Sequence, residues 1–284
     1  MCDTDEPAVA IGTSAIYAAV GLESAFYSYR VGTTVHASRE LDVYNRFRTL
    51  HVSNDYTGAT EVGSLFLDPS FVGRGAGRLV SLARMLVLGQ HQELFNEKLI
   101  AEMRGYQDDD GDSPLWEGLG RAFFTLPFPE ADRLSGLGNK VFISELMPHH
   151  PIYVHLLSEE AQNAIGRVHP STIPARRLLE SEGFAAGDYV DIFDGGPTLE
   201  ARLSDLRVVR EGRVVKVTTA SDIPQGPELL MGTRHLPTFR ATVSDRYLLA
   251  DSTLTVPQET LTALGANEGD PLNVTPFRKG LPVI

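Results

Sequence analysis

The alternation of apolar and polar positions between residues 59 and 104 predicts a strand, a helix and a second strand in direct succession. Residues 59–67 form a mostly apolar run that stops at Asp68-Pro69, as expected of a buried strand followed by a turn. Apolar residues then recur at helical spacing from about Gly75 toward Gln90, at Leu79, Leu82, Met85, Leu86 and Leu88. Residues 98–104 form another short apolar run. This order is a βαβ unit, whose two strands lie parallel.

The remaining pattern up to about residue 204 mixes further strands and helices. Strand-like runs cover residues 8–20, 29–36, 47–52, 141–147 and 189–193, with a turn expected at Asp194-Gly195-Gly196-Pro197. Helical patterns cover residues 115–124, 158–165 and 172–182. Ser158 and Thr172 are expected to cap the last two helices, which Gly166 and Gly183 end.

The pattern changes near residue 205. Short β-like runs follow at 213–218, 240–243 and 254–256, and residues 256–264 have the spacing of a helix. We therefore predict two domains: an α/β (α+β) core with a mixed, twisted sheet over residues 1–204, and a small β-rich C-terminal domain over residues 205–284.

Composition indicates a soluble globular protein and narrows the classes of partner. The chain has 284 residues, 42% of them hydrophobic, which is enough to bury a substantial core. Its 37 acidic residues outnumber 25 basic ones, for a net charge of -12, which disfavours nucleic acid and anionic membranes as partners. An anionic ligand must therefore be held locally, and main-chain amides at a helix start are suited to this.

The sequence shows neither an apolar targeting segment nor a pair of cysteines that could form a disulfide. The longer apolar segments, such as 79–88 with its Arg84, are interrupted well before the length that a bilayer requires. The first residues, Met1-Cys2-Asp3-Thr4-Asp5-Glu6, are acidic and lack an apolar signal core, so we expect a cytoplasmic protein. Cys2 is the only cysteine, which excludes an intrachain disulfide.

A glycine-rich loop joins the strand and helix of the βαβ unit. Gly73, Gly75 and Gly77 let the backbone approach a ligand closely, and the following helix offers unpaired N–H groups and the positive end of its dipole. Phosphate fits such a site. The loop is neither a Walker P-loop, since no Gly-Lys-Ser/Thr follows, nor the dinucleotide fingerprint, which needs a glycine at Arg78. The alternative is that the glycines only form a tight turn.

A second segment strengthens the ligand-binding interpretation. Residues 175–184 have the pattern A-x-x-L-L-E-x-x-G-F, and a glycine loop followed downstream by such a helix resembles the GNAT superfamily of CoA-dependent acyltransferases. In that superfamily the loop amides bind the CoA pyrophosphate, which implies this role for residues 73–77. The match is partial: Gly75 and Gly77 fit the superfamily pattern, whereas Val72 stands where Gln or Arg is usual.

Five longer blocks resemble one family in particular. Residues 20–45, 101–105 (AEMRG), 145–157 (ELMPHHPIYVHLL), 168–176 (VHPSTIPAR) and 191–200 (DIFDGGPTLE) are similar to arginine N-succinyltransferases, in the same order. The resemblance implies transfer of succinyl from succinyl-CoA to the α-amino group of L-arginine, the first step of the succinyl pathway of arginine catabolism. It covers most of the chain up to about Arg210, and the tail matches only loosely. The family normally has an additional N-terminal strand and helices before residue 8, which we expect this chain to lack.

The resemblance also implies roles for two residues next to the loop and the second helix. His169 is expected to donate the proton to the departing thiolate, because Leu179 stands where many GNAT enzymes have a proton-donating tyrosine. Leu65, late in the first strand of the βαβ unit, is expected to contact succinyl-CoA through its main-chain N–H, which suits an oxyanion donor. Arg74 and Arg78 are expected to reach the CoA phosphates.

The substrate guanidinium requires a carboxylate, and four candidates stay open: Glu102, Glu145, Asp191 and Asp194. Arg104 or Arg176 would suit the succinyl carboxylate. His149, His150 and His155 have no completed ligand spacing, so we assign no metal, and succinyl-CoA is expected as a substrate with no retained cofactor. Alternatives are transfer to ornithine or to both amino acids, and a non-catalytic CoA- or arginine-binding subunit. Both a homo- and a hetero-oligomer fit the sequence.

Overall fold

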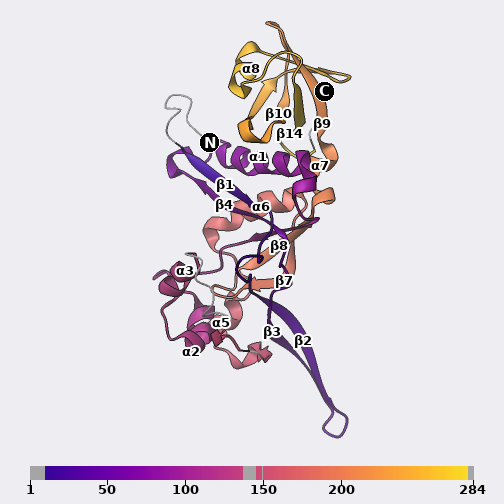
Figure 1. The fold of residues 1–284 in the computed structure, drawn as a ribbon. Coiled ribbons are helices and arrows are strands. Elements are labelled where there is room, and N and C mark those ends of the chain that lie inside the picture. Colours follow the sequence, from indigo (N-terminus) through magenta and orange to yellow (C-terminus); the bar gives the residue numbers. More distant parts are fainter. Residues whose placement is uncertain (1–9, 137–144, 149, 281–284) are drawn as a thin grey trace.

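The chain folds around two β-sheets, with one long helix between them (Figure 1). The computed structural model describes residues 10–136, 145–148 and 150–280. The larger sheet has eight strands in the order β1-β4-β5-β8-β7-β2-β3-β6. Their bounds are β1 Gly12–Tyr17, β2 Ser28–Ser38, β3 Val43–Ser53, β4 Thr60–Leu67, β5 Lys98–Glu102, β6 Ile152–Tyr153, β7 Ala185–Asp191 and β8 Pro197–Arg202.

The predicted βαβ unit is confirmed as β4, the helix α1 (Ala76–Gln90) and β5. Strands β4 and β5 are parallel, and they pair only through Thr60 with Leu99 and Glu61 with Ile100. The two strands therefore separate toward their C-terminal ends, which leaves a gap in the sheet where the glycine loop and the segment after β5 begin. Ligands of open α/β sheets bind at such a strand edge.

Helices on the larger sheet bury two hydrophobic clusters. The first contains Leu82, Met85, Leu86 and Leu88 of α1, with Leu178 and Leu179 of α6 (Ile173–Glu182). The second surrounds Trp116 and lies at the base of the β2–β3 hairpin, whose tip extends away from the molecule (Figure 1). Its helical elements are a π-helical turn Trp116–Gly120, α2 Arg121–Phe124, α3 Phe128–Gly136 and α5 Glu159–Ala164.

The β-rich region that follows has its own six-stranded sheet, in the order β11-β10-β14-β9-β13-β12. Its elements are α7 Arg207–Glu211, β9 Arg213–Thr219, β10 Gln225–Thr233, β11 Ala241–Arg246, β12 Leu248–Ala250, β13 Thr253–Val256, α8 Gln258–Leu264 and β14 Pro271–Pro276. Helix α1 lies against this sheet as well, because Leu230 and Phe277 belong to the same apolar cluster as Leu86. A buried ion pair between Arg207 and Glu182, with Nη2 and Oε1 2.9 Å apart, joins α7 to α6.

Three local predictions need correction or fall partly outside the described residues. Of the strand predicted at 141–147, residues 141–144 are not described, and Glu145 and Leu146 are helical. The strand predicted at 189–193 ends at Asp191, because the carboxylate Oδ1 of this residue accepts the N–H groups of Phe193 and Asp194 and forms a turn. Thr172 does not cap α6 through its side chain.

Candidate active site

The glycine loop and His169 lie at the ends of two neighbouring strands. The loop follows β4 directly, and β5 continues into Arg104 and Gly105. Gly105 pairs with Val168, and the N–H of His169 donates to the carbonyl of Arg104 at 2.9 Å. Since β4 and β5 are parallel, their C-terminal ends share one edge of the sheet. The structure therefore places the two predicted features at the same edge of the sheet.

Strand β4 carries a bulge at Ser64 and Leu65. The register with β1 shifts between Thr13 and Ala15, and neither Ser64 nor Leu65 has a partner in that register. Ser64 has a φ of 49°, a left-handed conformation that costs a residue other than glycine roughly 1–3 kcal/mol. The Tyr17 hydroxyl and Ser64 Oγ, 2.8 Å apart, help to hold it. A bulge of this kind turns main-chain groups out of the ladder, which is what an amide that binds substrate requires.

The glycine loop leaves open space above the start of α1. Gly73 and Gly75 have φ values of 86° and 81°, and a Cβ at either position would meet nothing within 4 Å. Gly75 is the N-cap of α1 and has no side chain to accept its first amides. The helix N-terminus is therefore suited to an anion. Gly77 has no positive φ, and its Cβ would make ordinary contact with Leu67.

Two arginines beside the loop rest on aromatic rings. The guanidinium of Arg74 lies 5.6 Å from the centre of the Phe71 ring, and that of Arg78 lies 5.9 Å from the centre of the Phe277 ring. Burial and the nearby Arg278 lower the pKa of Arg78 from its usual value. The junction with the smaller sheet therefore contributes positive charge next to the loop, within an acidic chain.

His169 is the N-cap of the 3-10 turn Pro170–Thr172 that leads into α6. Its Nδ1 accepts the N–H of Ser171 at 3.2 Å and lies 2.7 Å from Ser171 Oγ. The ring orientation is thereby fixed, and Nε2 is the nitrogen left for a substrate. Partial burial, and then the charge of Arg104, lower the pKa of His169, whereas Asp194 opposes the shift. The imidazole is accordingly neutral at pH 7.

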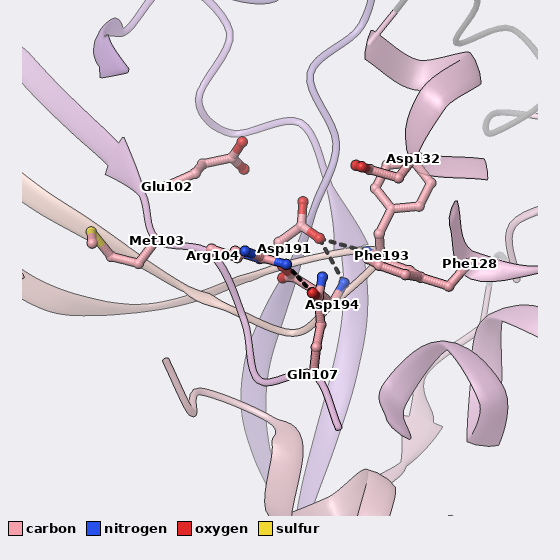
Figure 2. A pocket seen from close by; sticks show the side chains of 9 residues that line it. All are labelled: Glu102, Met103, Arg104, Gln107, Phe128, Asp132, Asp191, Phe193 and Asp194. Carbon is pink, nitrogen blue, oxygen red and sulfur yellow. Dashed lines mark hydrogen bonds between the residues drawn. The ribbon is translucent and has the colours of Figure 1, made fainter. Parts of the chain in front are cut away.

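Two adjoining cavities of about 320 and 630 Å³ form an acidic cleft next to β4 and the end of β5. Both are lined by Glu102, Asp132, Asp191 and Phe193. Figure 2 shows the carboxylates of Glu102 from β5, Asp132 from α3 and Asp191 from β7 facing the same space. The larger cavity extends to Tyr17, Glu61 and Ser64. The cleft thus connects a set of carboxylates with the bulge of β4.

Asp191 and Asp194 are also structural acceptors. Asp194 accepts the N–H of Gly105 at 2.7 Å and that of Gly196 at 2.8 Å. A Cβ at Gly105 or Gly196 would collide with neighbouring main-chain atoms, so the close approach of these two segments requires glycine. Desolvation, together with the charge of Asp194, raises the pKa of Asp191. Burial and Asp194 raise the pKa of Asp132. A bound cation would offset this mutual repulsion.

The other predicted residues lie in different surroundings. Glu145 is exposed and does not line either cavity. Arg104 lines the smaller cavity and donates to Gln107 (Figure 2), whereas Arg176 pairs with Glu180 of its own helix at 2.8 Å. Asp132 and Glu61 line the cleft but were not among the sequence candidates. No local signal distinguishes them, because acidic side chains on helices and strands most often face solvent.

The described residues contain neither a membrane-spanning helix nor a metal-binding cluster. None of the helices in the described part is long and apolar enough to cross a membrane. Within the same residues, no cluster of three or more His, Cys, Asp or Glu side chains has an arrangement that would hold a metal ion.

Comparisons with known proteins agree with one another. Residues 1–208 match the family described as arginine N-succinyltransferase beta subunit, and residues 210–276 match the C-terminal domain of that subunit. An arginine N-succinyltransferase from Citrobacter koseri is 51% identical over 240 residues, which are 84% of this chain and 70% of that protein. One from Escherichia coli is 47% identical over 270 residues, 94% of this chain and 78% of that protein.

One solved structure has a similar fold over nearly the whole of this chain. It is described as arginine/ornithine succinyltransferase subunit AI from Pseudomonas aeruginosa, and it is 37% identical with a TM-score of 0.85. The similarity covers 94% of this chain and 77% of that one. Most of the chain is therefore similar in sequence to these enzymes, and nearly all of it is similar in fold to the solved structure.

Proposed function

Because the chain belongs to the arginine N-succinyltransferase beta subunit family, we propose that it transfers the succinyl group of succinyl-CoA to the α-amino group of L-arginine. The products are CoA and an arginine succinylated at its α-nitrogen. The protein is an acyltransferase of arginine catabolism, and succinyl-CoA is its substrate rather than a retained cofactor. The main support for this assignment is the acidic cleft. It extends to the bulge of β4, the strand that the glycine loop follows.

The cleft is suited to the guanidinium of arginine. Glu102, Asp132 and Asp191 face one space, and a guanidinium presents several N–H donors that carboxylates accept in pairs. With its guanidinium held there, arginine directs its α-amino group along the larger cavity toward Ser64. Arg104, in the same wall, is placed to bind a carboxylate of a substrate.

The thioester is placed at the other end of the cleft. The main-chain amides at the start of α1, behind Gly73 and Gly75, bind the CoA pyrophosphate, and Arg74 and Arg78 contribute positive charge. The N–H of Leu65, in the bulge of β4, donates to the thioester oxygen. This hydrogen bond strengthens as negative charge develops on the oxygen during attack by the amine.

His169 moves the proton. Its lowered pKa leaves the imidazole neutral at pH 7, so the ring takes a proton from the attacking amine in the tetrahedral intermediate. The resulting imidazolium then donates that proton to the departing thiolate of CoA, and the ring returns to its neutral form. Direct attack needs no covalent enzyme intermediate.

The proposal is tested with purified protein, succinyl-CoA and L-arginine. We expect one thiol to be released for each arginine consumed, with the succinyl group on the α-nitrogen by mass spectrometry. L-Ornithine is measured in parallel, and we expect a lower kcat/KM for it, since its ammonium cannot bind two carboxylates in a fork. Absence of thiol release from protein that binds succinyl-CoA would contradict the proposal.

A second candidate is a subunit whose activity depends on a partner chain. The matched family is described as a beta subunit and the structural neighbour as subunit AI, which supports assembly into a homo- or hetero-oligomer. Mass photometry together with the assay separates the two: a homogeneous species that turns over supports an enzyme complete in itself. The cytoplasmic location expected from the sequence stays a prediction, to be checked by cell fractionation.

We further propose a domain boundary near residue 205. The separate six-stranded sheet and the two family regions, 1–208 and 210–276, support it. Limited proteolysis is expected to cleave near the exposed Ser204 and Asp205 before it cleaves within the strands of the two sheets. Cleavage within β4 or β10 at the same rate would contradict this boundary.

A further inference from the structure

Helix α1 buries an arginine in the face that packs on the larger sheet. Arg84 is 6% exposed, and its neighbours Leu82, Met85 and Leu86 are fully buried. Arginine is rarely buried in this way unless its charge has a partner. Burial lowers the pKa of Arg84 to about 10, although the charge of Glu61 opposes the shift, so the guanidinium keeps its charge at pH 7. Because burial of a charged guanidinium in an apolar helix face costs free energy, Arg84 is expected to make a contact that offsets this cost.

The guanidinium binds the main chain of β4 at the bulge. Nη1 of Arg84 donates to the carbonyl of Gly63 at 2.9 Å, and Nη2 donates to Ser81 Oγ at 3.4 Å. The Gly63 carbonyl belongs to the same rigid peptide plane as the nitrogen of Ser64. Fixing the direction of that carbonyl therefore restrains φ of Ser64, the residue in the left-handed conformation.

The remaining restraints on Ser64 come from the opposite strand. Tyr17 contacts its side chain at 2.8 Å, and Thr13 Oγ1 donates to its carbonyl at 3.4 Å. These contacts are exposed, whereas the Arg84 contact is part-buried and charge-assisted. Charge-assisted hydrogen bonds are about twice as strong as neutral ones. Arg84 is thus the stronger of the restraints that keep the bulge in its unfavourable conformation.

We propose that Arg84 is a positioning residue for the acyl transfer: it holds the peptide before Ser64 so that the next amide, Leu65 N–H, is directed at the thioester oxygen. Arg84 itself touches neither substrate. The inference rests on the proposed function for its catalytic consequence, but the restraint on the bulge is a property of the protein alone. A lysine at this position would reach the strand with a freely rotating ammonium instead of a planar guanidinium and would restrain the carbonyl less.

Substitution of Arg84 separates positioning from packing. Arg84→Met keeps an unbranched apolar side chain in place of the arginine's aliphatic stem and removes the donors. We expect kcat to fall about 10- to 100-fold, below the full loss of an oxyanion donor, with KM for both substrates within about threefold. Arg84→Lys is expected to recover part of kcat. A fall confined to stability, with kcat unchanged in the folded variant, would overturn the proposal.

A second substitution tests the bulge directly. Glycine adopts positive φ without strain, so Ser64→Gly in the Arg84→Met background is expected to restore kcat at least threefold. Arg207→Met is the matched control, because it also removes a buried arginine, here one that pairs with Glu182. In the Arg207→Met background, Ser64→Gly is not expected to raise kcat. Equal effects of Ser64→Gly in both backgrounds would overturn the proposal.

Hydrogen exchange gives a readout that does not need turnover. In Arg84→Met, amides of residues 62–67 are expected to exchange at least tenfold faster than in the wild type, while those of β5 keep their rates. Unchanged exchange over residues 62–67 would contradict the restraint. If the wild type shows no arginine succinylation but the exchange result holds, the proposed function fails while the role of Arg84 in the bulge stands.

Discussion

Replacement of Glu102 by glutamine tests how the protein selects its amine substrate. Glu102 lines both cavities of the cleft and its carboxylate faces Asp132 and Asp191. The substitution keeps the shape of the side chain and removes its charge. We expect KM for L-arginine to rise while kcat stays nearly constant, because the contact is made in the ground state and in the transition state alike.

The expected size follows from the charges in the cleft. A guanidinium about 4 Å from a carboxylate gains about 4 kcal/mol at an effective dielectric constant of 20. Desolvation and the nearby Arg104 oppose this gain, and hydrogen bonds to charged groups contribute about 1.5–3 kcal/mol net. Since Asp132 and Asp191 remain, we expect a loss of about 2 kcal/mol, which corresponds to a KM about 30-fold higher.

The assay compares arginine with citrulline, which has the same shape but a neutral ureido group. The ratio of kcat/KM for the two amino acids is expected to fall by the same factor of about 30 in Glu102→Gln. Glu117→Gln is the control, because Glu117 pairs with Arg121 at 2.9 Å on an exposed helical surface. A KM within about twofold of the wild type, with an unchanged ratio, would refute the assignment of the cleft to the guanidinium.

Further predictions concern the proton carrier, the glycine loop and the buried ion pair. His169→Ala is expected to lower kcat about 100-fold or more. In the wild type, kcat/KM is expected to rise with pH as His169 loses its proton, at a pKa below the usual 6.5 of histidine, and steady-state rates at several pH values will show that this rise is absent in the variant. Gly75→Ala and Gly58→Ala place Cβ at φ values of 81° and 85° in open space, so both lower Tm similarly, but only Gly75→Ala raises KM for succinyl-CoA; an equal KM in both would contradict the loop assignment. Arg207→Met leaves the carboxylate of Glu182 buried without its partner and is expected to cost about 3–5 kcal/mol in urea unfolding, much of which Glu182→Gln recovers.

The βαβ unit was predictable because its signals are local. The apolar run of β4, the helical spacing in α1 and the glycines between them lie within one continuous stretch of sequence. Ser158 as the cap of α5 is also confirmed, since its side chain accepts from Ala161 N. Thr172 failed as a cap because His169, three positions earlier, takes that role for the turn before α6. Serine, threonine and histidine compete at such positions, and sequence spacing alone does not decide among them.

The site was less predictable because its residues meet through the sheet order. Strand β7 brings Asp191, and α3 brings Asp132, to the end of β5, and nothing near either residue in the sequence indicates this. The bulge at Ser64 has no signature either, because serine does not favour positive φ. Arg84 was visible as a charge within an apolar run, but its partner, the Gly63 carbonyl, depends on how α1 packs on β4.

A crystal structure with CoA bound tests the central claim most directly. We expect the pyrophosphate oxygens to accept main-chain N–H groups of residues 75–78 at about 3 Å, and the thiol sulfur to lie between Leu65 N and His169 Nε2. A pyrophosphate bound away from the start of α1, or a sulfur on the side of the sheet opposite His169, would contradict it.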